Sequence, residues 1–567
     1  MRDFSSIDST AFDLIVIGGG VNGAAVARDG ALRGLKTILV EKGDFGGGTT
    51  SWSTRLVHGG LRYLEYFEFN LVRESLRERE ILLNTAPHLV HPVQLTLPLY
   101  DYSSRSYWEI QAGMILYDIL SFDKSLPNHR MLRPAKLRQL FRAVNPNGVK
   151  GGSQYYDGQA EYAERLCLEI ILSAQAADAV ALNYVEVSEL QRHGDRVIGL
   201  TCKDGLSDQT FTIGSHERTM IVNTSGPWVD RVCQQGVEGS TPAPIGTTRK
   251  IGGTKGSHIL VNPFPGAPDT AFYVEAAADN RPFFIVPFLG MYLIGTTDLK
   301  YEGDLDPVKA DNDEVDYLIA ETNQVLPSAR LTRESVRFTY SGIRPLPYAE
   351  GKKPGSISRN HILFEHAAEG VKNMVSLIGG KLTTHRRVGE EAVDWVYQQR
   401  QQPVPPSPTR HQPLPGAILP NDRRITQAFA DYGDRVQPEA LDHLFHLYGA
   451  KAVEVLALID ESADLAEPIV SYLPDIKAQI VYAIRAEMAY NLIDICRRRT
   501  SLAIQANYGY DALAAIAETL QRHCGWDEER CDRAIQNYVT YMRENCIPDY
   551  VLQSDALETP KAPAIVG

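Results

Sequence analysis

Cysteine is scarce in this sequence, and its distribution does not suggest metal binding. The 567 residues include 7 cysteines. None forms a C-x-x-C pair or joins histidine at the spacing of zinc ligands. Scattered cysteines of this kind favour a reducing compartment. The sequence therefore predicts no metal site.

Long hydrophobic runs and targeting signals are also missing. No stretch of about 18 apolar residues occurs, so we expect no transmembrane helix, and any membrane association must be peripheral. The segment Met1–Ala11 is polar and mildly acidic. It has neither the apolar core of a signal peptide nor the Arg-rich pattern of a transit peptide.

The sequence has fewer basic than acidic residues. With 57 Lys and Arg against 70 Asp and Glu, the formal net charge is −13. This balance argues against a nucleic-acid partner, which would require a basic face. The hydrophobic content of 44% and charged content of 22% are ordinary for a globular protein, and the length predicts two or three domains.

The amino-terminal stretch carries the strongest local signal. Leu14–Ile17 is a short apolar run, as expected of a strand buried on both faces of a parallel sheet. Gly18, Gly20 and Gly23 follow with the spacing G-x-G-x-x-G. These glycines suit a tight turn, close approach of the backbone to a pyrophosphate, and close packing of helix on strand.

The residues after this turn complete a dinucleotide-binding pattern. A helix is expected over 24–33, with free N–H groups at its start for phosphate, and a second strand over 36–40. Glu41 then stands eighteen residues after Gly23, where a carboxylate accepts hydrogen bonds from a ribose diol. Because a carboxylate there would repel a 2′-phosphate, NADP is disfavoured.

A stretch of small, hydroxyl-bearing residues comes next, from Gly43 to Gly60. Such a backbone can wrap a cofactor, and the alternative is a mobile surface loop. Further along, period-two and helical patterns predict additional elements. Strands are expected at 92–98, 184–190, 197–202, 210–213, 219–222, 282–287, 291–295 and 375–378, and helices at 70–84, 108–122, 157–177 and 386–398.

The carboxy-terminal part has a different composition. Residues 401–416 contain six prolines and predict an extended linker. Apolar residues then recur every three or four positions from Ile476 to Ile495, and again from Cys531 to Met542 after Asp527, a predicted N-cap. The end of the chain, 551–567, is expected to be a flexible tail.

Several motifs together resemble a known family, the FAD-dependent, quinone-linked aerobic glycerol-3-phosphate dehydrogenases of the glycine/D-amino-acid oxidase class. The resemblance runs from Phe12 to about Arg400 and continues more loosely over Arg485–Thr500. Two departures are the Gly46–Gly48 run and His385, where the family often has tyrosine. The matching segments are 18–23 with Glu41, 55–65, 224–228, 255–258, 294–298, 340–346 and 379–384.

The resemblance implies an α/β fold: a Rossmann-like FAD-binding domain with an inserted β-rich substrate domain and a helical C-terminal domain. The expected boundaries are 1–90, 155–250 and 335–400 for the FAD-binding domain, 91–154 and 251–334 for the substrate domain, 401–416 for the linker and 417–550 for the helical domain.

The resemblance also implies an activity: oxidation of sn-glycerol 3-phosphate to dihydroxyacetone phosphate, with a hydride passing from C2 to flavin N5 and electrons passing to a membrane quinone. The expected location is cytoplasmic, on the inner face of the cell membrane, and a homodimer is compatible with the sequence. Three alternatives stay open: an oxidase that produces H2O2, a flavin-binding sensor without turnover, and a nicotinamide-dependent enzyme.

A phosphate ester needs fixed cations, because it carries about −1.5 to −2 charge. Arg62, Arg344 and Lys381 are expected to supply them, since each lies in a Gly- or Pro-bracketed motif. Tyr63 and Asp298 are expected beside the substrate. The residues expected to contact the cofactor are Gly18, Gly20, Gly23, Glu41, Thr50, Ser51, Ser53, Gly59, Gly226, Gly380, Lys381, Leu382 and Thr383.

Two histidines, His58 and His258, are candidates for the base that takes the hydroxyl proton, with His258 preferred. Arg344 near the C2 hydroxyl would lower the pKa of the alcohol. A basic triplet, Arg497–Arg499, has two interpretations of equal weight. It either satisfies a helix C-terminus or contacts another domain or an anionic lipid.

Overall fold

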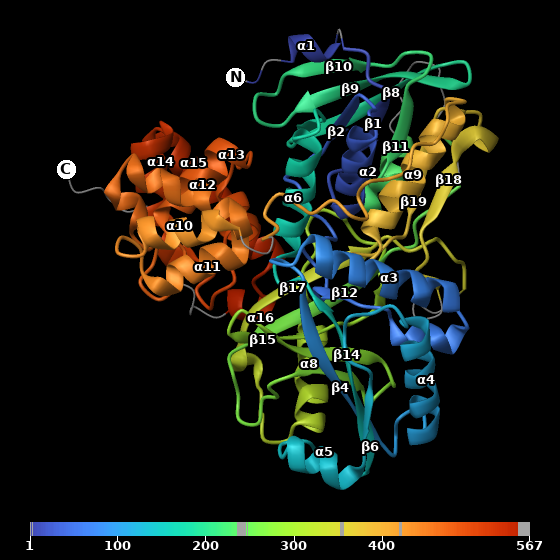
Figure 1. Ribbon diagram of the computed structural model, residues 1–567, viewed down its shortest axis with the longest axis vertical. Coiled ribbons are helices and arrows are strands. Elements are labelled where there is room, and N and C mark those ends of the chain that lie inside the picture. Colours follow the sequence, from blue (N-terminus) through green and yellow to red (C-terminus); the bar gives the residue numbers. More distant parts are fainter. Residues whose placement is uncertain are drawn as a thin grey trace.

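The computed structural model describes residues 2–553, except 3, 9, 235–244, 247, 352–356 and 419–421. From residue 554 on, the expected flexible tail lies outside the described residues. Figure 1 shows three parts: a sheet covered by helices, a larger sheet below it, and a helical lobe beside both. Within the described chain, every helix is too short or too polar to cross a bilayer.

The first part is a six-stranded sheet built around the amino-terminal strand. Its order is β18-β19-β11-β1-β2-β7, parallel except for the edge strand β18. Helix α2 packs between α6 and α9. The bounds are β1 Leu14–Ile17, β2 Thr37–Val40, β7 Val180–Leu182, β11 Met220–Asn223, β18 Ile362–Glu365, β19 Met374–Ile378, α2 Val21–Leu32, α6 Ala163–Gln175 and α9 His385–Gln399.

A small antiparallel sheet is attached to the first one at the top of Figure 1. It has the order β10-β9-β8, and the predicted strands in this region are confirmed. The short helices α1 and α7 pack against it. The bounds are α1 Ser5–Asp8, β8 Val185–His193, β9 Arg196–Asp204, β10 Thr210–Gly214 and α7 Val229–Gln234.

The largest sheet has the order β16-β12-β15-β14-β13-β4-β6-β3, with β17 on β12 and β5 on β6. Helix α8 packs on one face, and α3 and α4 pack on the other. The bounds are β3 Leu56–Val57, β4 His91–Tyr100, β5 Arg130–Leu132, β6 Val149–Gln159, β12 Thr254–Val261, β13 Ala271–Glu275, β14 Pro282–Phe288, β15 Met291–Gly295, β16 Leu299–Lys300, β17 Val336–Arg344, α3 Phe69–Thr85, α4 Tyr107–Leu120, α5 Pro134–Leu140 and α8 Asn312–Val325.

Two expectations for this region are wrong. The helix expected from Asp157 begins only at Ala163, because β6 continues to Gln159 as a partner of β4, from Tyr100↔Val149 to His91↔Gln159. Strand β17 lies in the large sheet through its pairing with β12. The segment 335–400, expected in the FAD-binding domain, therefore starts in the other domain.

The helical lobe follows the proline-rich linker. Asp527 caps α15 as predicted, since its carboxylate accepts a hydrogen bond from the backbone N of Arg530. The helical periodicity over Ile476–Ile495 does not form one continuous helix: α13 ends at Ala486, and Met488 has φ 55°. The bounds are α10 Arg423–Tyr432, α11 Pro438–Tyr448, α12 Ala452–Ala457, α13 Lys477–Ala486, α14 Leu513–Cys524, α15 Glu528–Asn545 and α16 Asp549–Leu552.

Candidate active site

The turn between β1 and α2 is as tight as its glycines predict. Gly18 has φ +103°, and a Cβ added there would lie 2.8 Å from the Cα of Ser225. A Cβ on Gly23 would lie 1.9 Å from the carbonyl O of Gly18. Gly23 therefore allows α2 to pack directly on the turn, and it does not line the cavity described below.

The start of α2 is available for an anion. Gly20 occupies the N-cap position and has no side chain that could cap the helix. Thr50 Oγ1 accepts from the backbone N of Val21 at 3.1 Å, which leaves the other N–H groups at the start of the helix to a ligand. Uncapped N–H groups and the helix dipole together favour phosphate at this position.

Glu41 is fixed at the end of β2. Its Oε2 accepts from the N of Gly19 at 2.6 Å and its Oε1 from the N of Gly43 at 2.8 Å. Burial raises the pKa of Glu41, while these two hydrogen bonds oppose the shift. Each carboxylate oxygen keeps a second lone pair, so the side chain can also accept from ribose hydroxyls.

A cavity of about 490 Å³ runs from this turn to the large sheet. Four of its lining residues carry a buried polar atom without a hydrogen-bond partner among the described residues: Asn22 Oδ1, Arg55 Nε, Trp228 Nε1 and His258 Nδ1. Buried polar atoms normally have partners, so a polar ligand fits this space. A dinucleotide cofactor satisfies both the uncapped helix and these atoms.

Most residues expected to contact the cofactor line this cavity: Gly18, Gly20, Glu41, Thr50, Ser53, Gly226, Gly380, Lys381, Leu382 and Thr383. Ser51 and Gly59 do not line it. Ser51 donates from Oγ to the O of Gly46 at 2.7 Å, and Gly59 donates from N to the OH of Tyr117 at 3.0 Å. Both shape the surrounding backbone.

Cations gather where the cavity meets the large sheet. Arg344 donates from Nη1 to Asp298 at 3.1 Å and from Nη2 to Thr296 Oγ1 at 2.7 Å, and Arg359 donates to the other oxygen of Asp298 at 3.3 Å. Burial lowers the pKa of Arg344 to about 10, so it stays charged at neutral pH. Burial would raise the pKa of Asp298, but Arg344 and Arg359 hold it below its usual value.

Lys381 completes this cluster. Its ammonium lies 4.1 Å from the ring centroid of Tyr63 and donates to Ser75 Oγ at 3.1 Å. Burial lowers its pKa. Lys381, Tyr63, Arg344 and Arg359 all line the cavity. Three cations line this end of the cavity, whereas the nearby carboxylates of Asp298, Glu68 and Glu74 do not line it, so the cavity wall presents positive charge.

Two expected substrate contacts lie elsewhere. Arg62 is on the short helix η1 (Leu61–Tyr66), where it donates to the OH of Tyr66 at 3.4 Å, and it does not line the cavity. Asp298 lies behind Arg344 and Arg359 and holds both guanidinium groups. Arg359 takes the place expected for Arg62; the sequence signal was available, because Arg359 follows a Gly- and Ser-containing stretch.

Both candidate bases line the cavity. His258 stacks on Tyr340 with ring centroids 4.8 Å apart, and its Nε2 lies 2.9 Å from Thr54 Oγ1. If Nε2 carries the proton, the unpartnered Nδ1 can accept one. Burial, Arg344 and Arg55 lower the pKa of His258 well below 6.5. Burial lowers the pKa of His58 to about 4, so both rings are neutral at pH 7.

The helical lobe also reaches the cavity. Arg498, Tyr541 and Asn545 line it, and nothing in the local sequence around them predicts this. Among the described residues, no group of three or more His, Cys, Asp or Glu side chains could hold a metal ion.

The fold and the cavity agree with what comparison with known proteins finds. Residues 13–395 match the family of FAD-dependent oxidoreductases named DAO, and residues 407–531 match the C-terminal domain of alpha-glycerophosphate oxidase. The fold and site are thus those of an FAD-dependent oxidoreductase, and FAD is the cofactor that the cavity accommodates.

Individual relatives narrow the family. A glycerol-3-phosphate dehydrogenase from Synechocystis sp. is 62% identical over 97% of this chain and 100% of its own. D-erythritol 1-phosphate dehydrogenase from Brucella abortus is 35% identical over 86% and 94%. The structure of glycerol-3-phosphate dehydrogenase from Bacillus halodurans with FAD aligns with TM-score 0.75 and 27% identity over 96% of each chain. The chain belongs to the FAD-dependent glycerol-3-phosphate dehydrogenase family.

Proposed function

We propose that the protein oxidises sn-glycerol 3-phosphate to dihydroxyacetone phosphate. The observation that carries this proposal is the cluster of Arg344, Arg359 and Lys381 at the same end of the cavity as His258. The names of the most similar relatives support the same substrate. A doubly charged phosphate on a three-carbon chain matches fixed cations placed beside a neutral imidazole.

The cations and His258 have different roles in the proposed reaction. The guanidinium groups of Arg344 and Arg359 offer planar forks to the phosphate oxygens, and Lys381 offers a point charge. His258 is the proposed base for the hydroxyl proton of C2, since its ring is neutral and Nδ1 has no hydrogen-bond partner among the described residues. Bound FAD supplies the acceptor for the hydride from C2, at flavin N5.

The test is anaerobic mixing of purified holoprotein with small alcohols while the yellow absorbance of the flavin is followed. We expect sn-glycerol 3-phosphate to bleach it and glycerol to leave it unchanged. Arg344→Ala should keep its flavin and lose at least about 100-fold in the rate of bleaching, the size typical for loss of one charged donor. Arg249→Ala, a surface variant paired with Glu302, is the control.

The length of the carbon chain is the open point of the substrate assignment, because one relative is a D-erythritol 1-phosphate dehydrogenase. The same assay with D-erythritol 1-phosphate decides it. If D-erythritol 1-phosphate bleaches the flavin faster, the four-carbon ester is the substrate instead of sn-glycerol 3-phosphate. A flavin that stays yellow with both esters would contradict the proposal.

We further propose that a membrane quinone takes up the electrons. The alternative acceptor is O2, and formation of H2O2 during aerobic turnover would favour it. Support for a membrane acceptor comes from the outward face of α4. Trp108, Ala112, Ile115, Ile119 and Phe122 lie along one side of this helix or directly after it, and all are exposed.

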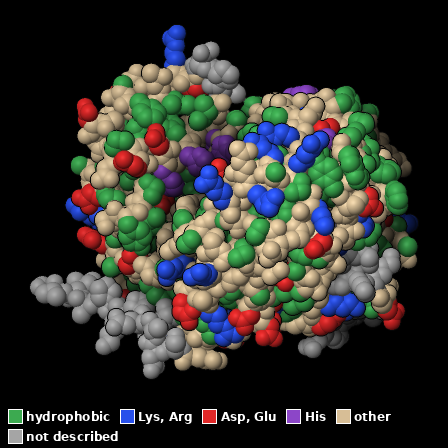
Figure 2. Space-filling view, turned by 90° about the horizontal axis from the view of Figure 1, so that it is seen from below, with side chains coloured by type: hydrophobic (Ala, Val, Ile, Leu, Met, Phe, Trp, Pro, Cys, Tyr) green, Lys and Arg blue, Asp and Glu red, His purple; other side chains and the backbone are tan. Residues whose placement is uncertain are grey.

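A second group of exposed aromatic side chains lies at the junction of η1 and α3. Phe67, 78% exposed, lies edge-on to Phe69 at 6.0 Å, and η1 packs against α4. In Figure 2 hydrophobic side chains gather on the right, the side of α4 in Figure 1, with Lys and Arg side chains beside them. An exposed face of this kind marks an interaction site.

Charge favours an anionic bilayer as the occupant. The segment 103–150 carries eight Lys or Arg and three Asp or Glu, in a chain whose net charge is −13. Apolar side chains that insert into the interface and cations that meet lipid phosphates are the two features of a peripheral membrane helix.

Flotation with lipid vesicles tests the location. Wild type should bind phosphatidylglycerol vesicles more tightly than phosphatidylcholine vesicles, and less tightly at high salt. The double variant Trp108→Ser/Phe122→Ser should bind at least about tenfold more weakly, since two inserted aromatic side chains are lost. Phe429→Ser on α10, 42% exposed, should bind like wild type. Equal vesicle binding by all three proteins would show that α4 does not contact the membrane.

A further inference from the structure

The arginine triplet of the helical lobe lies at its boundary with the FAD-binding domain. Arg497, Arg498 and Arg499 belong to a short π-helical segment, Asp494–Arg499, and are only 2%, 8% and 1% exposed. A buried guanidinium group requires partners. Of the two interpretations of this triplet, contact with another domain is therefore confirmed, and the partners show what the contact does.

Arg499 and Arg498 hold the start of the loop that follows β2. Arg499 donates to both oxygens of Asp44, at 2.6 and 3.0 Å, and Arg498 lies 3.5 Å from the same carboxylate. Asp44 is 2% exposed, and its other partner is Asn183 at 2.9 Å. Burial would raise the pKa of Asp44, but Arg499 and Arg498 hold it below its usual value.

Arg497 holds the end of the same loop. It donates from Nη2 to the carbonyl O of Ser51 at 3.2 Å, and its guanidinium lies 5.0 Å from the ring centroid of Trp52. It also donates to Glu164 at 2.6 Å, the carboxylate that Arg55 binds through both nitrogens at 2.6 and 2.7 Å. Arg55 donates to the O of Ser51 as well, at 3.0 Å.

Most residues of this loop, 44–55, line the cofactor cavity and form one part of its wall. The N of Gly46 donates to the O of Gly19 at 3.0 Å, and Thr50 bonds to the first turn of α2. The loop thus lies between the phosphate-binding turn and the helical lobe. The Gly46–Gly48 run has high backbone entropy when it is not held by other residues. Contacts from residues outside the loop therefore help to fix its conformation.

We propose that Arg497, Arg498 and Arg499 are positioning residues for FAD: the helical lobe clamps loop 44–55 and thereby sets how tightly the cofactor is held. Arg498 also lines the cavity and stands against Gly47, where an added Cβ would lie 3.2 Å from its Nη2. The proposal concerns cofactor retention and does not depend on which alcohol is oxidised.

The experiment measures FAD release. Holoprotein is diluted into buffer without FAD, and the rise of free-flavin fluorescence gives the dissociation rate; titration of apoprotein gives the dissociation constant. Arg499→Gln removes both bonds to Asp44. Arg497→Gln is the milder second variant, because Glu164 keeps Arg55 as a partner and no buried carboxylate loses its last cation.

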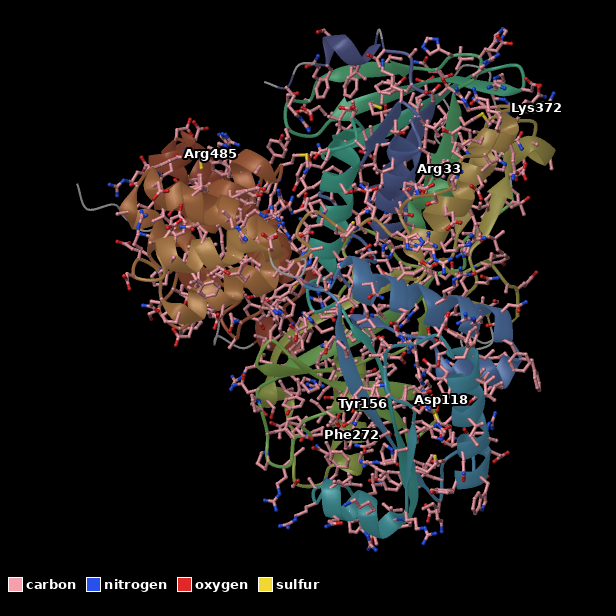
Figure 3. The ribbon with its side chains drawn as sticks, in the orientation of Figure 1. Arg33, Asp118, Tyr156, Phe272, Lys372 and Arg485 are labelled. Carbon is pink, nitrogen blue, oxygen red and sulfur yellow. The ribbon has the colours of Figure 1, made fainter. Side chains whose placement is uncertain are left out.

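Two matched controls separate the clamp from general docking of the lobe. His446→Gln removes a contact across the same boundary, to the carboxylate of Glu161 at 3.0 Å, and leaves in place the hydrogen bond from Arg55 of the loop to the backbone O of Glu161. Arg485→Gln removes an arginine on the outer side of the lobe, visible in Figure 3, which pairs within the lobe with Glu461. Arg499→Lys restores the charge without the two-point bond.

We expect Arg499→Gln and Arg497→Gln to raise the dissociation constant for FAD at least tenfold while the far-UV circular dichroism stays unchanged. The dissociation constant of Arg499→Lys should lie between those of these variants and wild type. Both controls should have dissociation constants within twofold of wild type. A constant within twofold of wild type in both triplet variants would overturn the proposal. An equal rise in His446→Gln would also overturn it, because the effect would then come from lobe docking in general.

Discussion

At the scale of single residues, the environment of His258 determines how the site should respond to pH. Its ring is 1% exposed, stacked on Tyr340, and placed near the cations Arg344 and Arg55. Burial lowers the pKa of His258 most, followed by the charges of Arg344 and Arg55. The neutral form, which a base must have, is therefore lost only when the pH falls well below 6.5.

We predict that the rate constant for anaerobic flavin reduction, divided by the dissociation constant of the substrate, shows no acid limb between about pH 8 and 6.5. His258→Gln should lower it by about 10²–10⁴-fold, the usual contribution of a general base. His216→Gln, at an exposed position, should match wild type. A fall in this ratio centred at the ordinary histidine pKa would show that burial and the neighbouring cations do not lower the pKa of His258.

Residues within local motifs were predictable, and residues brought in by the fold were not. Gly18, Glu41, Arg344 and Lys381 lie in recognisable runs, and all line the cavity. Arg359 follows a Gly- and Ser-containing stretch and Arg498 belongs to the Arg497–Arg499 triplet, but neither stretch shows that its arginine reaches the cavity. Their place follows from the salt bridges to Asp298 and Asp44, which join residues 61 and 454 positions apart, and no local pattern encodes such partners.

At the scale of elements, the contact between α2 and the turn before it sets the geometry of the phosphate end. Gly23 permits this contact, since an added Cβ would also lie 2.5 Å from Thr224 Oγ1. A methyl group there must push the helix away from β1 and the uncapped N–H groups away from the cavity.

We predict that Gly23→Ala lowers the free energy of unfolding by about 1–3 kcal/mol, the usual cost of overpacking, and lowers the ratio of bound flavin to protein. Gly113→Ala is the matched control: it lies in α4, and an added Cβ there meets nothing within 4 Å. It should be neutral or stabilising by up to about 1 kcal/mol. Urea unfolding and flavin absorbance measure both, and similar losses in the two variants would contradict the steric argument.

Periodicity predicted most elements and failed where tertiary pairing took over. Strand β6 overrides a helical pattern because β4 supplies a long ladder of partners. The helical pattern that passes through Met488 is interrupted because Glu487 turns inward to pair with Arg165 across the domain boundary. The local propensity to continue a helix is worth less than about 1 kcal/mol per residue, so tertiary contacts can override it.

At the scale of the whole molecule, three parts share one cavity. The first sheet supplies the turn and Glu41, the large sheet supplies His258 and Arg344, and the helical lobe supplies Arg498. The ion pairs of Asp44 and Glu164 join the first part to the lobe. A ligand that contacts all three parts stabilises their assembly by mass action.

We predict that added FAD raises the melting temperature of every part together. At a free concentration 100 times the dissociation constant, the gain should be about 2.7 kcal/mol. In the holoprotein, flavin release, loss of far-UV circular dichroism and the calorimetric transition should coincide. Unfolding of a separate part at a temperature that FAD leaves unchanged would contradict a shared cavity.

The span of the cavity along the chain has a consequence for biosynthesis. Its lining begins at Ile17 and ends at Asn545, so the nucleotide fold made first on the ribosome lacks part of its wall until nearly all of the polypeptide has been translated. Tight flavin binding should therefore follow completion of the helical lobe, and chains that end before this lobe should bind FAD more weakly than the full chain.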